Sequence, residues 1–295
     1  MSKPLAKPLA TLTLTSKPFF FVFDLDETLA EVYPLFDILE DALTTRRSTA
    51  AYRALVRRVA AEGGRGILRP GIRETMQRLH DLQRKSLVDG VWIYSNNGHL
   101  RSLHFIRDVI HAFLDTGQNG RPLILECIHW NHPRRTDAPE RNDKTWDSLR
   151  RFLPEGTTAD HVFFVDDLDH PDLHAALGDH YLQVPPYEYH VPFDDLLDVY
   201  EEALGEATAG LAPLTQRDRD RLHRLTKPKD SITPVPEVDP VFARLMEQAF
   251  SQVEPVEAQQ GGQKKRRHKR NTYKRIRNVR SRKNRRTKKG HLSRE

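Results

Sequence analysis

Cysteine is almost absent from this sequence, which has Cys127 as its one thiol in 295 residues. A lone cysteine cannot form an intramolecular disulfide, so the disulfide-stabilised secreted folds are excluded and a reducing, intracellular compartment is expected. Long apolar runs are also missing, since none approaches the roughly 20 residues of a membrane-spanning helix. We therefore expect no membrane association. With 38% hydrophobic and 30% charged residues, the chain can form a core, but much of it must face solvent or stay disordered.

Acidic residues are nearly absent from one end of the chain. From Lys264 onward there are 17 Lys and Arg residues and a single acid, Glu295. The whole chain has 47 basic and 41 acidic residues, so 30 basic and 40 acidic residues remain before Lys264. The net charge of +6 thus divides into −10 for the body and +16 for the tail.

The basic tail has too few apolar side chains to form a core. Residues Lys264–Lys289 hold 16 Lys and Arg residues in 26 positions, with Tyr273, Ile276 and Val279 as the substantial apolar side chains. Such runs bind nucleic acids by releasing counterions, act as nuclear or nucleolar addresses, or both. Similar compositions occur on nucleolar proteins and on proteins of large DNA viruses. We therefore expect a nuclear or nucleolar location, or a viral factory or virion if the protein is viral.

Composition also divides the rest of the chain. Residues 1–17 have no acid and contain two Lys-Pro pairs, which break helices, so we expect a disordered leader there. Residues 205–239 are rich in Pro, Thr and charge and are interpreted as a linker. Residues 240–256 have apolar side chains at helical spacing, and 257–295 continue as a disordered tail. The folded domain is expected over 18–204.

One short apolar run organises this domain. Phe19–Phe23 contains aromatic residues and a β-branched valine, which favours a central parallel strand buried on both faces. The run ends at Asp24 and Asp26, two like charges whose ionisation would be costly unless a cation or a proton lay between them. Ligands of open α/β sheets bind beyond the carboxyl ends of the strands. Taken alone, the stretch is also compatible with solvated acids that cap the next element.

Two later apolar runs end in polar groups in the same way. Val91–Ser95 stops at a hydroxyl, and Val162–Asp167 ends in adjacent carboxylates. Helical patterns separate these runs, and strands that alternate with helices predict an α/β fold with a parallel sheet covered by helices on both faces. The three strand ends would then converge, and adjacent carboxylates there favour a bound cation.

The polar groups follow one another in a recognisable order: Asp-Leu-Asp-Glu-Thr over 24–28, Ser95, Lys144 and Asp166-Asp167. This order resembles the four motifs of the haloacid dehalogenase-like phosphohydrolases. The spelling DLDETL and the run ILRPGIRETMQRLHDL over 67–82 are closest to the phosphatases that act on the C-terminal domain of RNA polymerase II and their small relatives, the NLI-interacting-factor-like proteins. The resemblance implies a haloacid dehalogenase-like domain with Mg²⁺-dependent phosphatase activity.

The resemblance also implies a chemical role for each of four side chains. Asp24 would attack phosphorus and form an aspartyl-phosphate, which divides the hydrolysis into two displacements. Asp26 would protonate the leaving oxygen and then take a proton from the attacking water. Ser95 and Lys144 would hold the phosphate oxygens on which charge develops in the transition state.

The same resemblance implies a magnesium site. Asp24, the carbonyl of Asp26 and Asp166 would hold the ion, which permits two negatively charged reactants to approach each other. Asp167 would either complete the coordination through water or orient Lys144. The site residues expected to bind metal are therefore Asp24, Asp26, Asp166 and Asp167.

Neighbouring residues complete the expected substrate site. Thr28 would support the loop, and Asn96 and Asn97 follow Ser95 where the family has a small residue. We place Thr28, Asn96 and Asn97 in the substrate-binding group, and the two asparagines leave the substrate specificity open. Asn97-Gly98 is also a common turn sequence, so a purely structural role for this pair stays open.

The sequence departs from the family after the first motif, where a β-hairpin flap is usual. Residues 32–66 show two apolar stripes at helical spacing, over 35–43 and 52–59, and predict a small helical insert above the active site. Its polar face is basic. Two interpretations stay open, a solvated helix face or a surface that receives an anionic substrate, and the arginines concerned are Arg46, Arg47, Arg53, Arg57 and Arg58.

Three functions are compatible with these features. The subfamily resemblance implies a phosphatase acting on phosphoserine or phosphothreonine in a protein. The basic tail and the altered second motif favour phosphate removal from nucleic-acid ends or nucleotides. A non-catalytic nucleic-acid-binding protein of the same fold is the third hypothesis, although it would not require competent residues at every motif position, and fold alone does not choose among the three.

Overall fold

A computed structural model describes the main body of the chain, and the described residues are 17–31, 49–61, 66–114, 121–137, 143–187, 198, 216–217, 219–220 and 238–254. The chain divides into two compact units, Met1–Met246 and Glu247–Glu295. Only 247–254 of the second unit are described. The tail over 257–295 and nearly all of the expected leader and linker lie outside the described residues.

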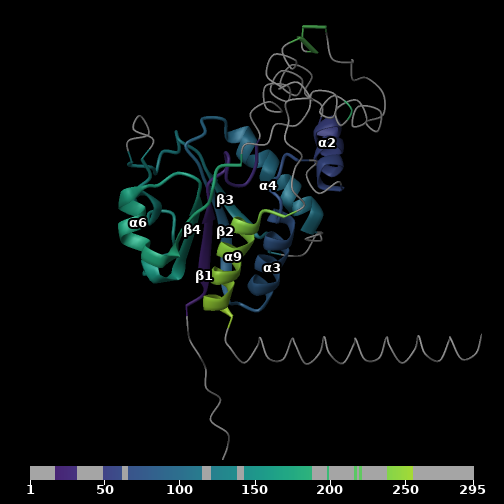
Figure 1. Ribbon diagram of the computed structural model, residues 1–295. Coiled ribbons are helices and arrows are strands. Elements are labelled where there is room, and N and C mark those ends of the chain that lie inside the picture. The colour runs from purple at the N-terminus through teal and green to yellow at the C-terminus, as the bar shows by residue number, and fades with distance from the viewer. Residues whose placement is uncertain are drawn as a thin grey trace, which may run out of the picture. The chain divides into compact units, whose positions relative to one another are not determined.

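Five parallel strands form one sheet in the order β3-β2-β1-β4-β5 (Figure 1). They are β1 (Phe19–Phe23), β2 (Val88–Tyr94), β3 (Ile124–Ile128), β4 (Val162–Asp166) and β5 (Tyr181–Gln183). β1 is central, as its unbroken apolar sequence predicts. The chain adds β2 and β3 on one side of β1 and then crosses back to place β4 on the other side, so the strand order reverses at β1.

The aromatic residues of β1 pack against both faces of the sheet, which confirms the prediction of a fully buried strand. Phe20 stacks on Trp92 of β2 with the ring centroids 4.8 Å apart. Phe21, the next residue, stacks on Phe163 of β4 at 4.9 Å. Successive side chains of a strand point to opposite faces, so these two contacts lie on different sides of the sheet.

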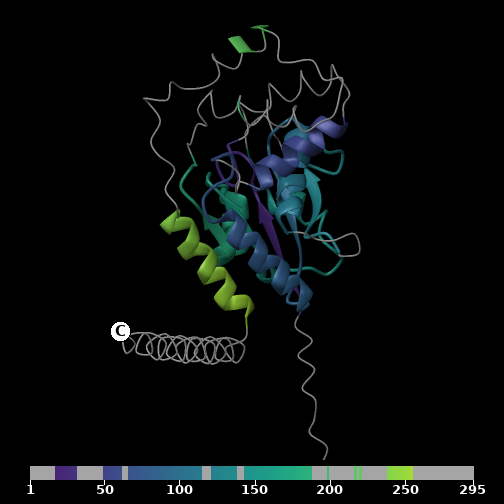
Figure 2. The same ribbon diagram turned by 90° about the vertical axis from the view of Figure 1, so that its right-hand side faces the viewer.

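Helices cover both faces, as the alternating pattern predicts. The described helices are α2 (Thr49–Ala61), α3 (Ile72–Arg84), α4 (Leu100–Leu114), α5 (Trp146–Leu149), α6 (Pro171–Leu177) and α9 (Pro240–Val253), with short 3₁₀ turns at Ala159–His161 and Gly178–His180. α3 and α4 pack on one face, and Figure 2 shows α3 crossing it. α5 and α6 contribute Leu149 and Leu173 to the apolar cluster on the face of Phe20 and Trp92. No helix in the described ranges is long and apolar enough to cross a membrane.

The strand β2 begins at Val88, three residues before the apolar run from which it was predicted. The added residues include Gly90, although glycine in a strand interior normally weakens the strand. Here it marks a close approach, since a Cβ at Gly90 would lie 2.3 Å from the Leu125 Cδ1 atom of the neighbouring segment. The missing side chain makes room for Leu125 and does not interrupt the strand.

Lys144 lies just before a short helix and is not part of it. The Thr145 hydroxyl accepts a hydrogen bond from the backbone N–H of Ser148 at 3.2 Å, so Thr145 is the N-cap and α5 starts at Trp146. The helix ends at Leu149, and the chain continues in tighter turns toward Pro154. Lys144 is therefore the residue before the cap and belongs to no helix or strand.

The second half of the predicted insert is helical. In α2 the apolar stripe predicted over 52–59 is largely buried, and the Tyr52 hydroxyl donates to Asp108 of α4 at 2.7 Å. Tyr52 also packs edge-on against Phe105 of α4. The described half of the insert therefore rests on α4. The first stripe, over 35–43, lies outside the described residues.

Removing a core ring should measure how much this sheet depends on its aromatic packing. Phe163 is fully buried and stacks on Phe21, so Phe163→Ala should lower the free energy of unfolding by about 3 to 5 kcal/mol. Urea denaturation followed by circular dichroism would measure the change. Arg84→Ala, at an exposed position, is the control and should change it by less than about 0.5 kcal/mol. Equal effects of the two substitutions would contradict the assignment of Phe163 to the core.

Candidate active site

The register of the sheet brings the polar strand ends together. The backbone N–H of Asp24 donates to the carbonyl of Val165 at 2.9 Å, which places Asp24 beside Asp166 at the end of β4. On the other side of β1, Phe23 pairs with Ile93, so Ser95 lies just beyond the end of β2. All strands are parallel, and their carboxyl ends therefore meet at one edge, where the strand order reverses.

A polar pocket of about 350 Å³ lies at this edge. Most of the sequence-predicted site residues line it, and the full lining is Asp24, Asp26, Glu27, Ser95, Asn96, Asn97, Lys144, Asp167 and Leu168. Thr28 and Asp166, the remaining two predicted residues, are completely buried and do not line the pocket. The predicted residues thus come from four separate segments and form one cluster.

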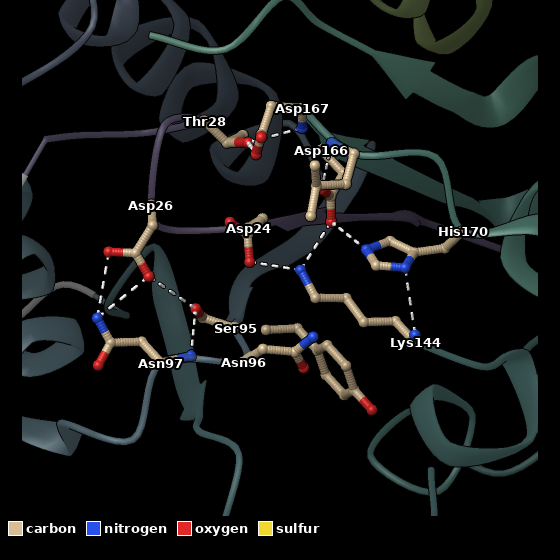
Figure 3. Close-up of polar contacts among 12 residues, drawn as sticks. Asp24, Asp26, Thr28, Ser95, Asn96, Asn97, Lys144, Asp166, Asp167 and His170 are labelled. Atoms are coloured by element: carbon tan, nitrogen blue, oxygen red, sulfur yellow. Dashed lines mark hydrogen bonds and ion pairs between the residues drawn. The ribbon is translucent and has the colours of Figure 1, made fainter. Parts of the chain in front are cut away.

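Lys144 is the basic residue among those that line the pocket. Its side chain is 3% exposed, and the ammonium group donates to Asp24 and, at 2.7 Å, to Asp166 (Figure 3). Burial acts to lower the pKa of Lys144, but the charges of Asp166 and Asp24 outweigh it and raise the pKa above its ordinary value. The ammonium therefore stays charged between the two carboxylates.

Three carboxylates at this edge could hold a metal ion. Oxygen atoms of Asp24, Asp166 and Asp167 all lie within 4.8 Å of one another. Burial raises the pKa of Asp24 well above its ordinary value, and the charges of Asp166 and Asp26 raise it further against the opposing effect of Lys144. One ammonium does not compensate this concentration of negative charge. The donor set and its excess charge fit a bound cation.

The side chain of Asp26 is not part of that group. Its two oxygens each accept a hydrogen bond from the Asn97 side-chain amide at 3.1 Å, and the Ser95 hydroxyl lies 3.4 Å away (Figure 3). Burial raises the pKa of Asp26, while the hydrogen bond from Asn97 opposes the rise. The Asn97 side-chain oxygen Oδ1 accepts from the backbone N–H of His99 at 2.7 Å, which fixes the orientation of the side-chain amide. Asn97 therefore holds Asp26 as well as lining the pocket.

Thr28 holds Asp167 through two hydrogen bonds. The Thr28 hydroxyl donates to the Asp167 carboxylate at 2.8 Å and accepts from its backbone N–H at 2.9 Å. Burial raises the pKa of Asp167, and the hydrogen bond from Thr28 opposes that effect. The prediction that Thr28 supports the loop agrees with this position, whereas contact with substrate would have to come from other groups because Thr28 is fully buried.

Sequence reasoning missed the arginine that fixes the loop after β2. Arg135 donates to the Ser95 carbonyl and to the Asn96 side-chain oxygen, both at 2.7 Å. It also makes two 2.9 Å contacts to Asp137 and lies 4.3 Å from the centre of the Tyr94 ring. Both charged side chains are at most 2% exposed. The segment that carries them, 129–137, has no periodic pattern, so the sequence offered no signal for this role.

His170 was also missed. Its Nδ1 atom accepts from the backbone N–H of Lys144 at 3.3 Å, and its Nε2 atom lies 3.3 Å from Asp166. Burial acts to raise the pKa of Asp166, but Lys144 and His170 lower it below the ordinary value. The available signal was the position of His170 four residues after Asp166, just before a proline that begins α6.

The described arginines of the insert do not line the pocket. Arg53, Arg57 and Arg58 belong to α2, which packs on α4. Arg46 and Arg47 lie outside the described residues. For the three described arginines, the structure supplies no contact with the predicted site, so the substrate-receiving interpretation stays a prediction for this face.

Comparison of the chain with protein-family models, with curated proteins and with solved structures found no match.

The buried Arg135–Asp137 pair should make stability depend on pH. Burial acts to raise the pKa of Asp137, but hydrogen bonds from Arg135 and Tyr94 lower it below the ordinary value. A lowered folded-state pKa stabilises the protein above the unfolded-state pKa, and that contribution is lost as the pH falls through the folded-state value. Asp137→Asn should therefore lower the free energy of unfolding by about 3 to 5 kcal/mol near neutral pH, and by less in acid.

Urea denaturation of wild type and Asp137→Asn from about pH 7 to pH 3 would measure this difference. Asp147→Asn is the matched control, because Asp147 is 73% exposed and pairs with Arg150 on the surface. Its effect should stay below about 1 kcal/mol throughout. A difference for Asp137→Asn that does not shrink in acid would show that the carboxylate charge does not contribute.

Proposed function

We propose that the protein is a Mg²⁺-dependent phosphatase that hydrolyses phosphate monoesters through an aspartyl-phosphate on Asp24. The observation that carries the proposal is the position of Asp24 in the pocket. It is hydrogen-bonded to Lys144 and belongs to a group of carboxylates that could hold a metal ion, with Asp26 on the same short turn. A nucleophile, a fixed cation and a second carboxyl group are the parts that phosphoryl transfer needs.

The carboxylates fit Mg²⁺ because hard divalent cations prefer oxygen ligands. Asp24, Asp166 and Asp167 would hold the ion through their side chains, and the backbone carbonyl of Asp26 is the further ligand that the family resemblance implies. When bound, the ion would neutralise charge on the phosphate and on Asp24 and thereby permit the two anions to approach. It would also favour the ionised form of Asp24, whose pKa is otherwise raised.

Asp24 and Asp26 divide the chemistry between them. A carboxylate oxygen of Asp24 attacks phosphorus as the ester oxygen leaves, and Asp26 gives its proton to that leaving oxygen. Asp26 then takes a proton from water, whose oxygen attacks the same phosphorus and displaces Asp24 with release of phosphate. The raised pKa of Asp26 favours the protonated form that the first step requires.

The remaining pocket residues would position the phosphate. The Lys144 ammonium and the Ser95 hydroxyl are donors on either side of Asp24, suited to the oxygens on which charge develops. Asn97 keeps Asp26 oriented through both carboxylate oxygens. Asn96 lines the same pocket, and its side-chain oxygen accepts from Arg135 at 2.7 Å, which fixes its place beside the proposed phosphate site.

The proposal extends to the family and the substrate. The central β1, the order β3-β2-β1-β4-β5 and the convergence of four motif segments support a haloacid dehalogenase-like domain. The resemblance of DLDETL to the RNA polymerase II C-terminal-domain phosphatases supports phosphoserine or phosphothreonine in a protein as substrate. The basic tail supports a nuclear location and contact with nucleic acid.

Loss of the nucleophile should abolish turnover. Asp24→Asn should remove Mg²⁺-dependent release of p-nitrophenol from p-nitrophenyl phosphate, because an amide does not form the acyl phosphate. Wild type in EDTA should also be inactive. Turnover by Asp24→Asn at the wild-type rate would refute the nucleophile assignment.

Asp26→Asn provides the matched comparison. This variant keeps the backbone carbonyl that the proposed ion would use but loses the proton donor and acceptor, so it should turn over at least about a hundredfold more slowly. Rapid quenching and mass spectrometry should detect phosphate attached to Asp24 in Asp26→Asn and not in Asp24→Asn. Wild-type turnover by Asp26→Asn would move the acid and base role to another group.

The basic tail favours a second candidate function, phosphate removal from nucleic-acid ends. Under the protein-phosphatase proposal, deletion of Lys264–Glu295 should leave hydrolysis of p-nitrophenyl phosphate and of a phosphoserine peptide unchanged, because the pocket residues all precede the tail. Phosphate release from end-labelled polynucleotide is the comparison. Selective loss of activity on polynucleotide after the deletion would favour the second candidate.

A further inference from the structure

The turn that follows β1 has a backbone conformation that needs external support. Glu27 has a φ of 56°, which is uncommon for a residue other than glycine. The turn is closed by hydrogen bonds from Leu29 and Ala30 to the Leu25 carbonyl at 2.9 and 3.1 Å. These bonds leave the carbonyls of Glu27 and Thr28 to accept from other segments. The turn carries Asp26, and Glu27 is the next residue in the chain.

Arg69 supplies most of that support. Its Nε atom donates to the Thr28 carbonyl at 2.7 Å, and its Nη2 atom donates to the carbonyls of Glu27 and Pro185, each at 2.5 Å. The side chain is fully buried and lies 5.6 Å from the ring centres of both Tyr187 and Phe242. A buried guanidinium needs a counter-charge, because burial alone lowers its pKa and carbonyls carry no net charge.

That counter-charge comes from Asp239, at the start of α9. One Asp239 oxygen lies 2.7 Å from Nη1 of Arg69. The other oxygen accepts from the backbone N–H groups of Val241 and Phe242 at 3.1 and 3.0 Å, so Asp239 is also the N-cap of α9. One carboxylate therefore joins the beginning of this helix to the arginine that holds the turn.

The same turn leads directly to the proposed metal ligands. Thr28, whose carbonyl accepts from Arg69, holds Asp167 with its hydroxyl, and Asp167 belongs to the carboxylate group of Asp24 and Asp166 (Figure 3). An uninterrupted series of charge-assisted and neutral hydrogen bonds thus runs from Asp239 through Arg69 and Thr28 to Asp167. Residues that orient metal ligands in this way affect metal affinity without touching the ion.

We propose that Arg69 and Asp239 are positioning residues of the phosphatase, and that the start of α9 sets the geometry of the metal-binding turn. The inference rests on the proposed function, because it concerns the same carboxylates. Under this proposal, Asp239, which lies more than 200 residues after Asp24, helps to set the geometry of the site. The resemblance, which covers about 18–204, assigns no role to Asp239.

Asp239→Asn tests the proposal in the full-length protein. Asparagine retains an oxygen that can cap α9 but removes the charge that pairs with Arg69. The dissociation constant for Mn²⁺, measured by calorimetry with the metal alone, should rise about tenfold. The Mg²⁺ concentration that gives half-maximal hydrolysis of p-nitrophenyl phosphate should rise by a similar factor, with a smaller change in kcat at saturating Mg²⁺.

Asp89→Asn is the matched control. Asp89 pairs with Arg121 at 2.9 Å and is 25% exposed, close to the 18% of Asp239, but it does not line the site pocket. It should leave Mn²⁺ affinity unchanged. If Asp239→Asn folds poorly, Asp239→Ser, which also caps helices, provides the same comparison.

The outcomes separate this inference from the proposed function. A lower Tm for Asp239→Asn with wild-type Mn²⁺ affinity would reduce the ion pair to a structural role and overturn the inference, even in an active phosphatase. Mn²⁺ binding by a wild-type protein that releases no phosphate from any ester would refute the phosphatase, while the change in affinity would still decide the role of Asp239. A wild-type protein that binds no Mn²⁺ would overturn both.

Discussion

The site depends on the confinement of several like charges at the end of one parallel sheet. Asp24, Asp26, Asp166 and Asp167 are brought together there with Lys144 as the ammonium group that faces them. Burial makes this repulsion expensive, as the raised pKa of Asp24 reflects. The arrangement persists because the packing of β1 between β2 and β4 fixes the strand ends, and the excess negative charge is what makes this edge suited to a cation.

Asp26, Asp166 and Asp167 are each held by a different set of side chains, whereas Asp24 shares Lys144 with Asp166. Asn97 holds Asp26, Thr28 holds Asp167, and Lys144 with His170 holds Asp166. These partners come from segments that follow different strands, so no single loop determines the geometry. Contacts from several segments hold the carboxylates of two strand ends, which preorganises the cluster. Buried residues outside the pocket, such as Thr28 and His170, therefore contribute to its geometry.

Charge divides the molecule into an acidic body and a basic tail. The lining of the pocket contains four acids and Lys144, whereas the tail from Lys264 carries a charge of +16. A pocket of this kind does not attract a polyanion by its own charge, so under the proposed function the phosphate would be recognised locally by the cation, Lys144 and Ser95. Any general affinity for nucleic acid would then belong to the tail, because the basic residues are concentrated there.

The sequence by itself determined that a parallel sheet forms and that acidic side chains follow its central strand. The apolar run Phe19–Phe23 and its acidic end specified a buried central strand and the position of Asp24, because burial and strand polarity are local properties of the chain. Only the tertiary structure revealed the partners. Three of these contacts join segments whose sequences share no pattern. Asn97 donates to Asp26, His170 lies beside Asp166, and Arg69 donates to the carbonyl of Thr28. Asp239 lies furthest from the motifs, and its role follows from packing, which brings distant charges together when a buried arginine requires one.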